Sequence, residues 1–195
     1  MTDRLRFAHT EIIRLSTLID DYQQIELFRQ NLVSSDSSLV LLSAVVAKVQ
    51  AEELAMAQRL PQLKISFDLP ESLPQIRIDA DLLRRAISAL VNYAVRGAGQ
   101  GAIVLQGSIN AQGWLKLAIT GSAFELAGAP TDALLDESRQ FLSSLGTEHK
   151  ATDWSATFIS IVLARLIVEY YGGKIEISTG DKANPGFVIL LPVAV

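Results

Sequence analysis

The chain has 195 residues, which is long enough for one core or for one domain of about 150 residues with an appendage. Its content of 49% hydrophobic and 19% charged residues is typical of a folded globular chain and excludes a disordered one. Its net charge of -4 and lack of any basic cluster argue against a nucleic-acid binder, and its zero cysteines exclude disulfides and zinc-thiolate sites. No apolar run reaches the roughly 18 residues that span a bilayer, and the first residues are no signal peptide, so we expect a cytoplasmic protein without membrane contact by this chain.

Residues 3–32 are predicted to form one long helix. Its apolar residues step by three and four in a heptad seam that consists of Leu5, Ala8, Ile12, Leu15, Ile19 and Tyr22. Ile25, Phe28 and Leu32 continue the apolar stripe after a slip in phase. Two interpretations are open: a helix packed on its own domain, or the stem of a coiled-coil or four-helix-bundle dimer.

The rest of the chain alternates helical and strand patterns. A serine-rich linker, residues 34–38, precedes a predicted helix that runs from Leu39 to about Leu60. Asp79 or Asp81 is expected to cap a helix that runs to about Arg96. Further elements are predicted as strands at 64–69, 102–109, 114–120, 174–178 and 187–193, a short amphipathic helix within 130–145, and a buried helix at 156–171 that ends at Gly172 and Gly173.

The run Ile167-Val-Glu-Tyr-Tyr-Gly-Gly-Lys-Ile175 resembles the end of the last helix in the ATP-binding domain of sensor histidine kinases. That domain is part of the wider ATPase superfamily that includes the gyrase and Hsp90 nucleotide domains. The run from Arg14 to Glu26 is similar to the second helix of the kinase dimerisation hairpin, and the order of the elements also follows the family.

The resemblance implies a fold and partners. We expect an α+β chain: a two-layer α/β sandwich with a mixed, mostly antiparallel sheet under about three helices, and an N-terminal dimerisation helix. Residues 1–33 would form that helix and residues 34–195 the ATPase-like domain. The implied partners are a second copy, bound through residues 3–32, and a response regulator or another two-component protein.

The family carries its phosphoacceptor histidine on a helix before the dimerisation helix. Nothing precedes Met1 here, so the resemblance implies that this helix was lost or lies in a longer chain. His9 lacks the adjacent acid and the proline of the family motif, and we expect it to be a surface histidine of the helix.

The resemblance also assigns a nucleotide pocket. The two asparagines of the family's asparagine box fall on Ser88 and Asn92, and Asn92 is the residue that would hold Mg²⁺ against the nucleotide phosphates. The adenine-binding aspartate falls on Thr120, which Gly121 follows. A neutral hydroxyl does not replace the strong hydrogen bond of a carboxylate to the base.

The glycines of the family's two loops are also replaced. Those near the base fall on Ser122 and Phe124, and those of the phosphate loop fall on Ala156, Phe158 and Ser160. A phosphate loop binds through bare backbone N–H groups, which a phenylalanine side chain obstructs. The segment between Leu126 and Asp153, where the family has a glycine-rich lid, has the amphipathic pattern of a helix instead.

We therefore expect a two-component module that has lost ATP binding, needs no cofactor, catalyses nothing and acts by dimerisation and protein contact. Two alternatives stay open. One is a functional histidine kinase fragment that uses Mg-ATP and has its phosphoacceptor upstream of Met1. The other is a histidine phosphotransfer protein, for which His9 is the candidate.

Overall fold

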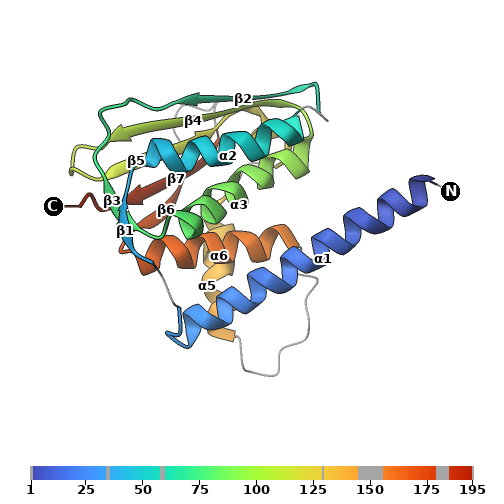
Figure 1. Ribbon diagram of the computed structural model, residues 1–195, viewed down its shortest axis with the longest axis horizontal. Helices are drawn as coiled ribbons and strands as arrows, with labels where there is room; N and C mark the ends of the chain where they lie inside the picture. The colour runs from blue at the N-terminus through green and yellow to red at the C-terminus, as the bar shows by residue number, and fades with distance from the viewer. Residues whose placement is uncertain are drawn as a thin grey trace.

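A computed structural model describes residues 2–33, 36–57, 60–128, 130–144, 156–178 and 185–194 (Figure 1). Its helices are α1 (Thr2–Arg29), α2 (Leu42–Ala57), α3 (Ala80–Ala98), α4 (Ser122–Leu126), α5 (Asp132–Ser144) and α6 (Ala156–Tyr170). Its strands are β1 (Ser38–Val40), β2 (Leu63–Asp68), β3 (Ile76–Ile78), β4 (Gly101–Ile109), β5 (Leu115–Thr120), β6 (Lys174–Ser178) and β7 (Gly186–Leu191).

Five strands form the main sheet in the order β2-β4-β5-β7-β6. Only β2 and β4 run parallel, and the three other pairs are antiparallel, which confirms the predicted mixed sheet. Side chains alternate along β5: Leu115, Leu117 and Ile119 are buried, whereas the residues between them are half-exposed.

Helices α2, α3 and α6 lie side by side against one face of this sheet (Figure 1). Their inward side chains, such as Leu83, Leu90 and Val162, are fully buried in one core with the strands. Burying each such side chain stabilises the fold by about 1.5–3 kcal/mol. The result is the two-layer α/β sandwich that the family resemblance implied.

Helix α3 has well-defined ends. Asp79 is the N-cap: its Oδ1 accepts hydrogen bonds from the backbone N–H groups of Asp81 at 2.9 Å and Leu82 at 3.1 Å. Asp81 therefore lies in the first turn and is not the cap. At the other end Gly99 adopts a left-handed conformation with φ 65°, and its N–H bonds the carbonyl of Val95. The helix is thus fixed at both ends beside the sheet.

The predicted start of the second helix was wrong. The helix was expected to begin at Leu39, but Ser38–Val40 forms β1, which pairs with β3 in a separate two-stranded sheet, and α2 begins only at Leu42. Ile76–Ile78, to which no strand was assigned, forms β3. Strands of three residues are too short to show alternation in a sequence, so their pairing is decided by tertiary contacts.

Helix α1 crosses α6 on the side away from the sheet, and its N-terminal part extends beyond the domain (Figure 1). Ile25 and Phe28 are buried against the domain, whereas Ile12, Leu15 and Ile19 are 64%, 56% and 57% exposed. The slip in phase therefore separates two faces of one helix. One face packs on the chain's own domain, and the described side chains of the seam are exposed to solvent. The side chains of residues 2–11 lie outside the described part of α1.

Candidate functional site

A pocket of about 140 Å³ lies between α3 and α6 and is bordered by α1. Ser88 and Asn92, two of the predicted nucleotide residues, line it from α3. Because they are four residues apart, one helical turn brings both to the same side of α3. The other polar side chains in the lining include Arg85 and Arg96 from α3, Ser160 from α6 and Asp21 from α1.

Two polar atoms in this pocket lack partners. Ser88 Oγ and Asn92 Oδ1 are buried, and neither has a hydrogen-bond partner among the described residues. Buried polar groups in folded proteins nearly always have a partner, which is often water. The pocket is therefore polar enough for ordered water or for a small polar ligand.

Asp21 closes one side of the pocket, although no sequence motif marks it. Its side chain is only 5% exposed although it belongs to the outermost helix. Arg85 donates to Oδ1 at 2.9 Å, and the hydroxyl of Ser160 donates to Oδ2 at 2.6 Å. One carboxylate thus joins α1 to both α3 and α6.

The other two predicted residues, Thr120 and Gly121, do not line this pocket. Thr120 is half-exposed and alternates with Ile119, so its side chain points to the sheet face away from the helices. Gly121 has φ 142°, and a Cβ atom added to it would lie 2.1 Å from the carbonyl oxygen of Ala102. No side chain can therefore be carried at position 121 without moving the backbone.

Phe124, which occupies a predicted glycine position, is 0% exposed. Its ring centroid lies 6.3 Å from that of Tyr93 and 5.7 Å from that of Phe187, and these two rings meet edge to face at 5.6 Å. The Tyr93 hydroxyl donates to the carbonyl of Gly128 at 2.7 Å, and burial raises the pKa of Tyr93. Three aromatic rings thus fill the interior between α3, α4 and β7.

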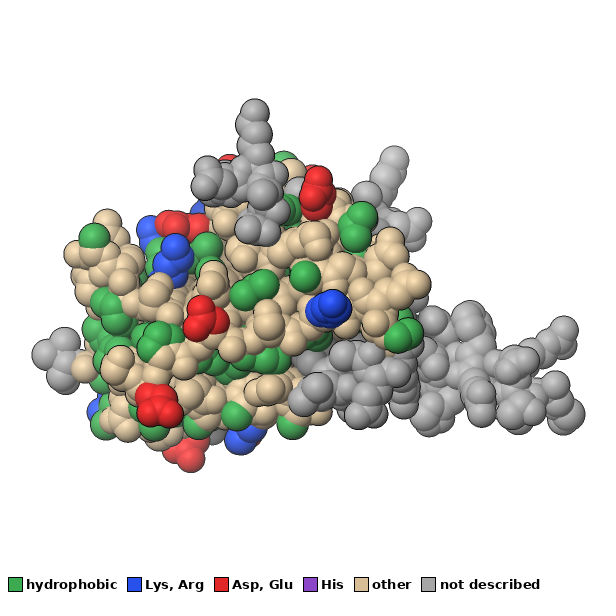
Figure 2. All heavy atoms as spheres, turned by 90° about the horizontal axis from the view of Figure 1, so that it is seen from above, with side chains coloured by type: hydrophobic (Ala, Val, Ile, Leu, Met, Phe, Trp, Pro, Cys, Tyr) green, Lys and Arg blue, Asp and Glu red, His purple; other side chains and the backbone are tan. Residues whose placement is uncertain are grey.

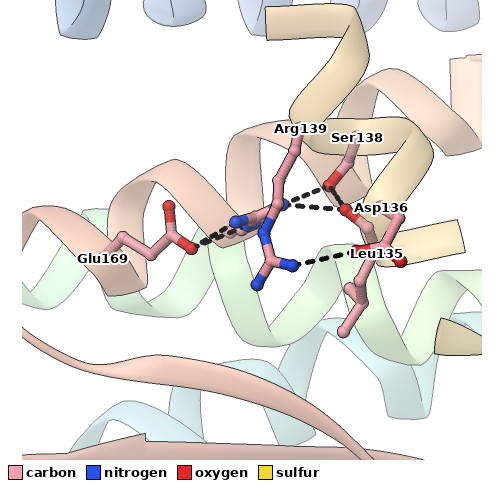
Figure 3. A network of polar contacts seen from close by, with 6 residues as sticks. Leu135, Asp136, Ser138, Arg139 and Glu169 are labelled. Carbon is pink, nitrogen blue, oxygen red and sulfur yellow. Dashed lines mark hydrogen bonds and ion pairs between the residues drawn. The ribbon is translucent and has the colours of Figure 1, made fainter. Parts of the chain in front are cut away.

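The predicted amphipathic helix of the lid region is confirmed as α5. Arg165 of α6, 6% exposed, donates to the Leu135 carbonyl at 2.8 Å and to Ser138 Oγ at 2.9 Å. It also donates twice to Glu169, at 2.7 and 2.6 Å. Figure 3 shows Leu135, Ser138 and Glu169 converging from the two helices on this network. Residues 145–155, the remainder of the predicted lid, lie outside the described part.

The predicted phosphate-loop positions have other contacts. Phe158 is buried and packs edge to face on Phe141 of α5, with ring centroids 5.8 Å apart. Ser160 donates to Asp21. Ala156 is the first residue of α6, and its side chain lies outside the described part. Phe158 is therefore engaged in packing within the chain, and Ser160 in a hydrogen bond within the chain.

The described residues hold no group of three or more His, Cys, Asp or Glu side chains that could bind a metal ion. On the face shown in Figure 2 the described Lys and Arg side chains are few and lie among Asp and Glu side chains, and no extended basic patch is visible. None of the described helices combines the length and apolar character that crossing a membrane requires. The side chain of His9 lies outside the described residues.

No family model matches the chain. The sensor histidine kinase ZraS of Escherichia coli K12 is 23% identical over 132 residues, which cover 68% of this chain and 26% of that protein. The protein of the same name in Escherichia coli O157:H7 is 22% identical over the same length. The chain thus spans about a quarter of the length of these curated relatives.

Solved structures resemble this fold over most of the chain. The histidine kinase AdeS of Acinetobacter baumannii has a TM-score of 0.71 at 17% identity, covering 98% of this chain and 84% of that one. Full-length ShkA in complex with AMPPNP has a TM-score of 0.70 at 16% identity, covering 93% of this chain and 36% of that one. The catalytic domain of the histidine kinase ThkA has a TM-score of 0.61 at 13% identity, covering 81% and 96%. The chain has the fold of the C-terminal, ATPase-like part of sensor histidine kinases.

Proposed function

We propose that the chain is a histidine-kinase-like module of two-component signalling that does not bind Mg-ATP in the manner of the family and acts by dimerisation and protein contact. The observation that carries this proposal is the Asp21 bridge at the pocket lined by Ser88 and Asn92. The pocket volume of about 140 Å³ is below the roughly 300–1,000 Å³ of sites for drug-sized ligands. The small volume of the pocket and the position of Asp21 in it support the absence of nucleotide binding.

The interior on the other side of α3 supports the same proposal. Phe124 and its two aromatic neighbours are packed against each other. The position of the base-binding carboxylate holds Thr120, whose side chain points to the sheet face away from the helices. These contacts of the described residues support the loss of Mg-ATP binding, and the Mg²⁺ contact assigned to Asn92 belongs to the kinase alternative only.

Calorimetric titration with Mg-ATP and Mg-ADP is expected to give no binding heat. Asp21 already binds Arg85, and the Phe124 ring fills space that a nucleotide needs. A thermal shift with and without nucleotide provides an independent readout, since a ligand that binds the folded state raises Tm. Micromolar binding, about -8 kcal/mol, would overturn the proposal and favour the kinase alternative.

The surface that we propose for binding a second copy is the heptad seam of α1. Four of its side chains are described: Ile12, Leu15, Ile19 and Tyr22. All four side chains are 45–64% exposed, and they follow one stripe of α1 that the domain does not cover. Contiguous exposed apolar surface on a helix is typical of a protein interface. We further propose a cytoplasmic protein whose other partner is a response regulator or another two-component protein.

Replacing Ile12, Leu15 and Ile19 together with serine is expected to convert a dimer to a monomer in sedimentation analysis, since each loses its apolar contact across the seam. Leu126 on α4 is 53% exposed but lies away from α1, so Leu126→Ser is the matched control and should leave the dimer intact. A monomeric wild-type chain, or loss of the dimer in the control, would count against the seam.

One observation favours the alternative of an ATP-dependent kinase. Ser88 Oγ and Asn92 Oδ1 lie in the pocket without partners among the described residues, and the structural neighbour ShkA was solved in complex with AMPPNP. Under this alternative α1 moves away before nucleotide enters, and Asn92 holds the Mg²⁺. The phosphotransfer alternative rests on His9, and unchanged phosphate passage in a His9→Ala variant would exclude it.

A further inference from the structure

Two kinds of contact hold α1 on the domain. Ile25 and Phe28 are apolar and buried, and Phe28 also meets Tyr170 of α6 edge to face at 5.4 Å. One turn further toward the N-terminus, Asp21 of α1 makes polar contacts with the domain at both of its carboxylate oxygens. Asp21 is thus where the described docking face changes from apolar packing to charge.

The bonding of Asp21 is divided between two helices. Each carboxylate oxygen accepts one bond, Oδ1 from Arg85 of α3 and Oδ2 from Ser160 of α6. Bonds to an ionised acceptor are roughly twice as strong as neutral ones. The neighbouring Asp20 is exposed, which makes it a natural comparison of the same charge on the same helix.

The chain beyond α1 has the geometry of a pivot. Asn31, two residues after the end of α1, adopts φ 53° and is the only non-glycine residue with positive φ in the described part. Leu32, which follows it, is 61% exposed and makes no part of the core. Movement of α1 about this turn would leave the packing of the sheet and of α2 and α3 intact.

We propose that Asp21 is an ionic clasp that keeps α1 closed over the pocket between α3 and α6, and that losing its charge releases α1 from an otherwise folded domain. While the clasp is closed, the domain is fixed to the helix that carries the seam. When it opens, the pocket loses its α1 wall and the domain moves relative to that helix. This inference goes beyond the proposed function, because it concerns how α1 is held on the domain and not nucleotide binding or dimerisation.

The chain has no cysteine, so a single introduced thiol reports local opening. Ile25→Cys places a thiol at a fully buried position on the docked face of α1, and Ile119→Cys places one at a fully buried position in β5. Reaction with a thiol reagent in the absence of nucleotide then measures α1 release at the first position and unfolding of the domain at the second.

Asp21→Asn is expected to accelerate reaction of the Ile25→Cys thiol by about tenfold or more, the ratio that corresponds to one lost hydrogen bond to a charged group. The Ile119→Cys thiol should keep its rate. Asp20→Asn should leave both rates unchanged. Arg85→Gln should reproduce the effect of Asp21→Asn, because it removes the same ion pair from the opposite helix.

An unchanged rate at the Ile25→Cys thiol in the Asp21→Asn chain would overturn the clasp. Equal acceleration of both thiols would also overturn it, since the charge would then stabilise the whole domain and not the closure of α1. Calorimetry on the unmodified chain tests nucleotide binding separately, so failure of the clasp and failure of the proposed function are distinguishable.

Discussion

Arg165→Ala is expected to lower the free energy of unfolding by about 3 kcal/mol, because it removes a buried guanidinium together with four hydrogen bonds. Two of these bonds reach across to α5, at the Leu135 carbonyl and at Ser138 Oγ. Ser138 is fully buried and keeps only its own bond to the Leu135 carbonyl after the substitution. Glu169 is partly exposed, so water compensates its lost partner.

Urea unfolding followed by circular dichroism measures this change, and hydrogen exchange shows whether α5 is loosened first. Arg139→Ala is the control on α5 itself: Arg139 pairs with Asp136 at 2.8 Å, but both side chains are about 60% exposed. Exposed pairs of this kind contribute less than about 1 kcal/mol. If both substitutions had the same effect, Arg165 would not be the residue that fixes α5 to α6.

Phe124→Ala is expected to destabilise the domain by about 3–5 kcal/mol, since it empties a fully buried ring site between Tyr93 and Phe187. Leu126→Ala, two residues further along α4 and 53% exposed, should change stability by less than about 0.5 kcal/mol. The comparison separates the aromatic cluster from any general effect on α4. A loss below about 1 kcal/mol for Phe124→Ala would mean that the neighbouring rings collapse into the space.

Periodicity and glycine signals predicted most of the elements. The apolar spacing of α6 and the glycine pair after it predicted this helix and its C-terminal end. In the structure α6 ends at Tyr170, and Gly172 adopts a φ of 74° just beyond it. The slip in phase within α1 was also visible in the sequence, but the sequence did not show which apolar residues pack on the chain's own domain. Only the structure shows that Ile25 and Phe28 pack on the same chain while Ile12 and Leu15 stay exposed.

The candidate site was less predictable. Ser88 and Asn92 were found through the family resemblance and lie together in the pocket, whereas Thr120 points to the opposite sheet face. Asp21 and Arg165 were missed because a charged residue on a helix is usually solvated. Their roles depend on partners 64 and 30 residues away in sequence, which no local pattern shows.

The parallel pairing of β2 with β4 affects the order in which the domain assembles. β4 and β5 meet across a tight turn, whereas β2 pairs with β4, Leu63 opposite Gly101, only after the intervening chain has folded back. Closing this longer loop loses more chain entropy, so β2 is expected to join a sheet that already contains the β4–β5 hairpin. Until it joins, β4 presents an unpaired backbone edge. Newly made chains are therefore most prone to aggregate through this edge.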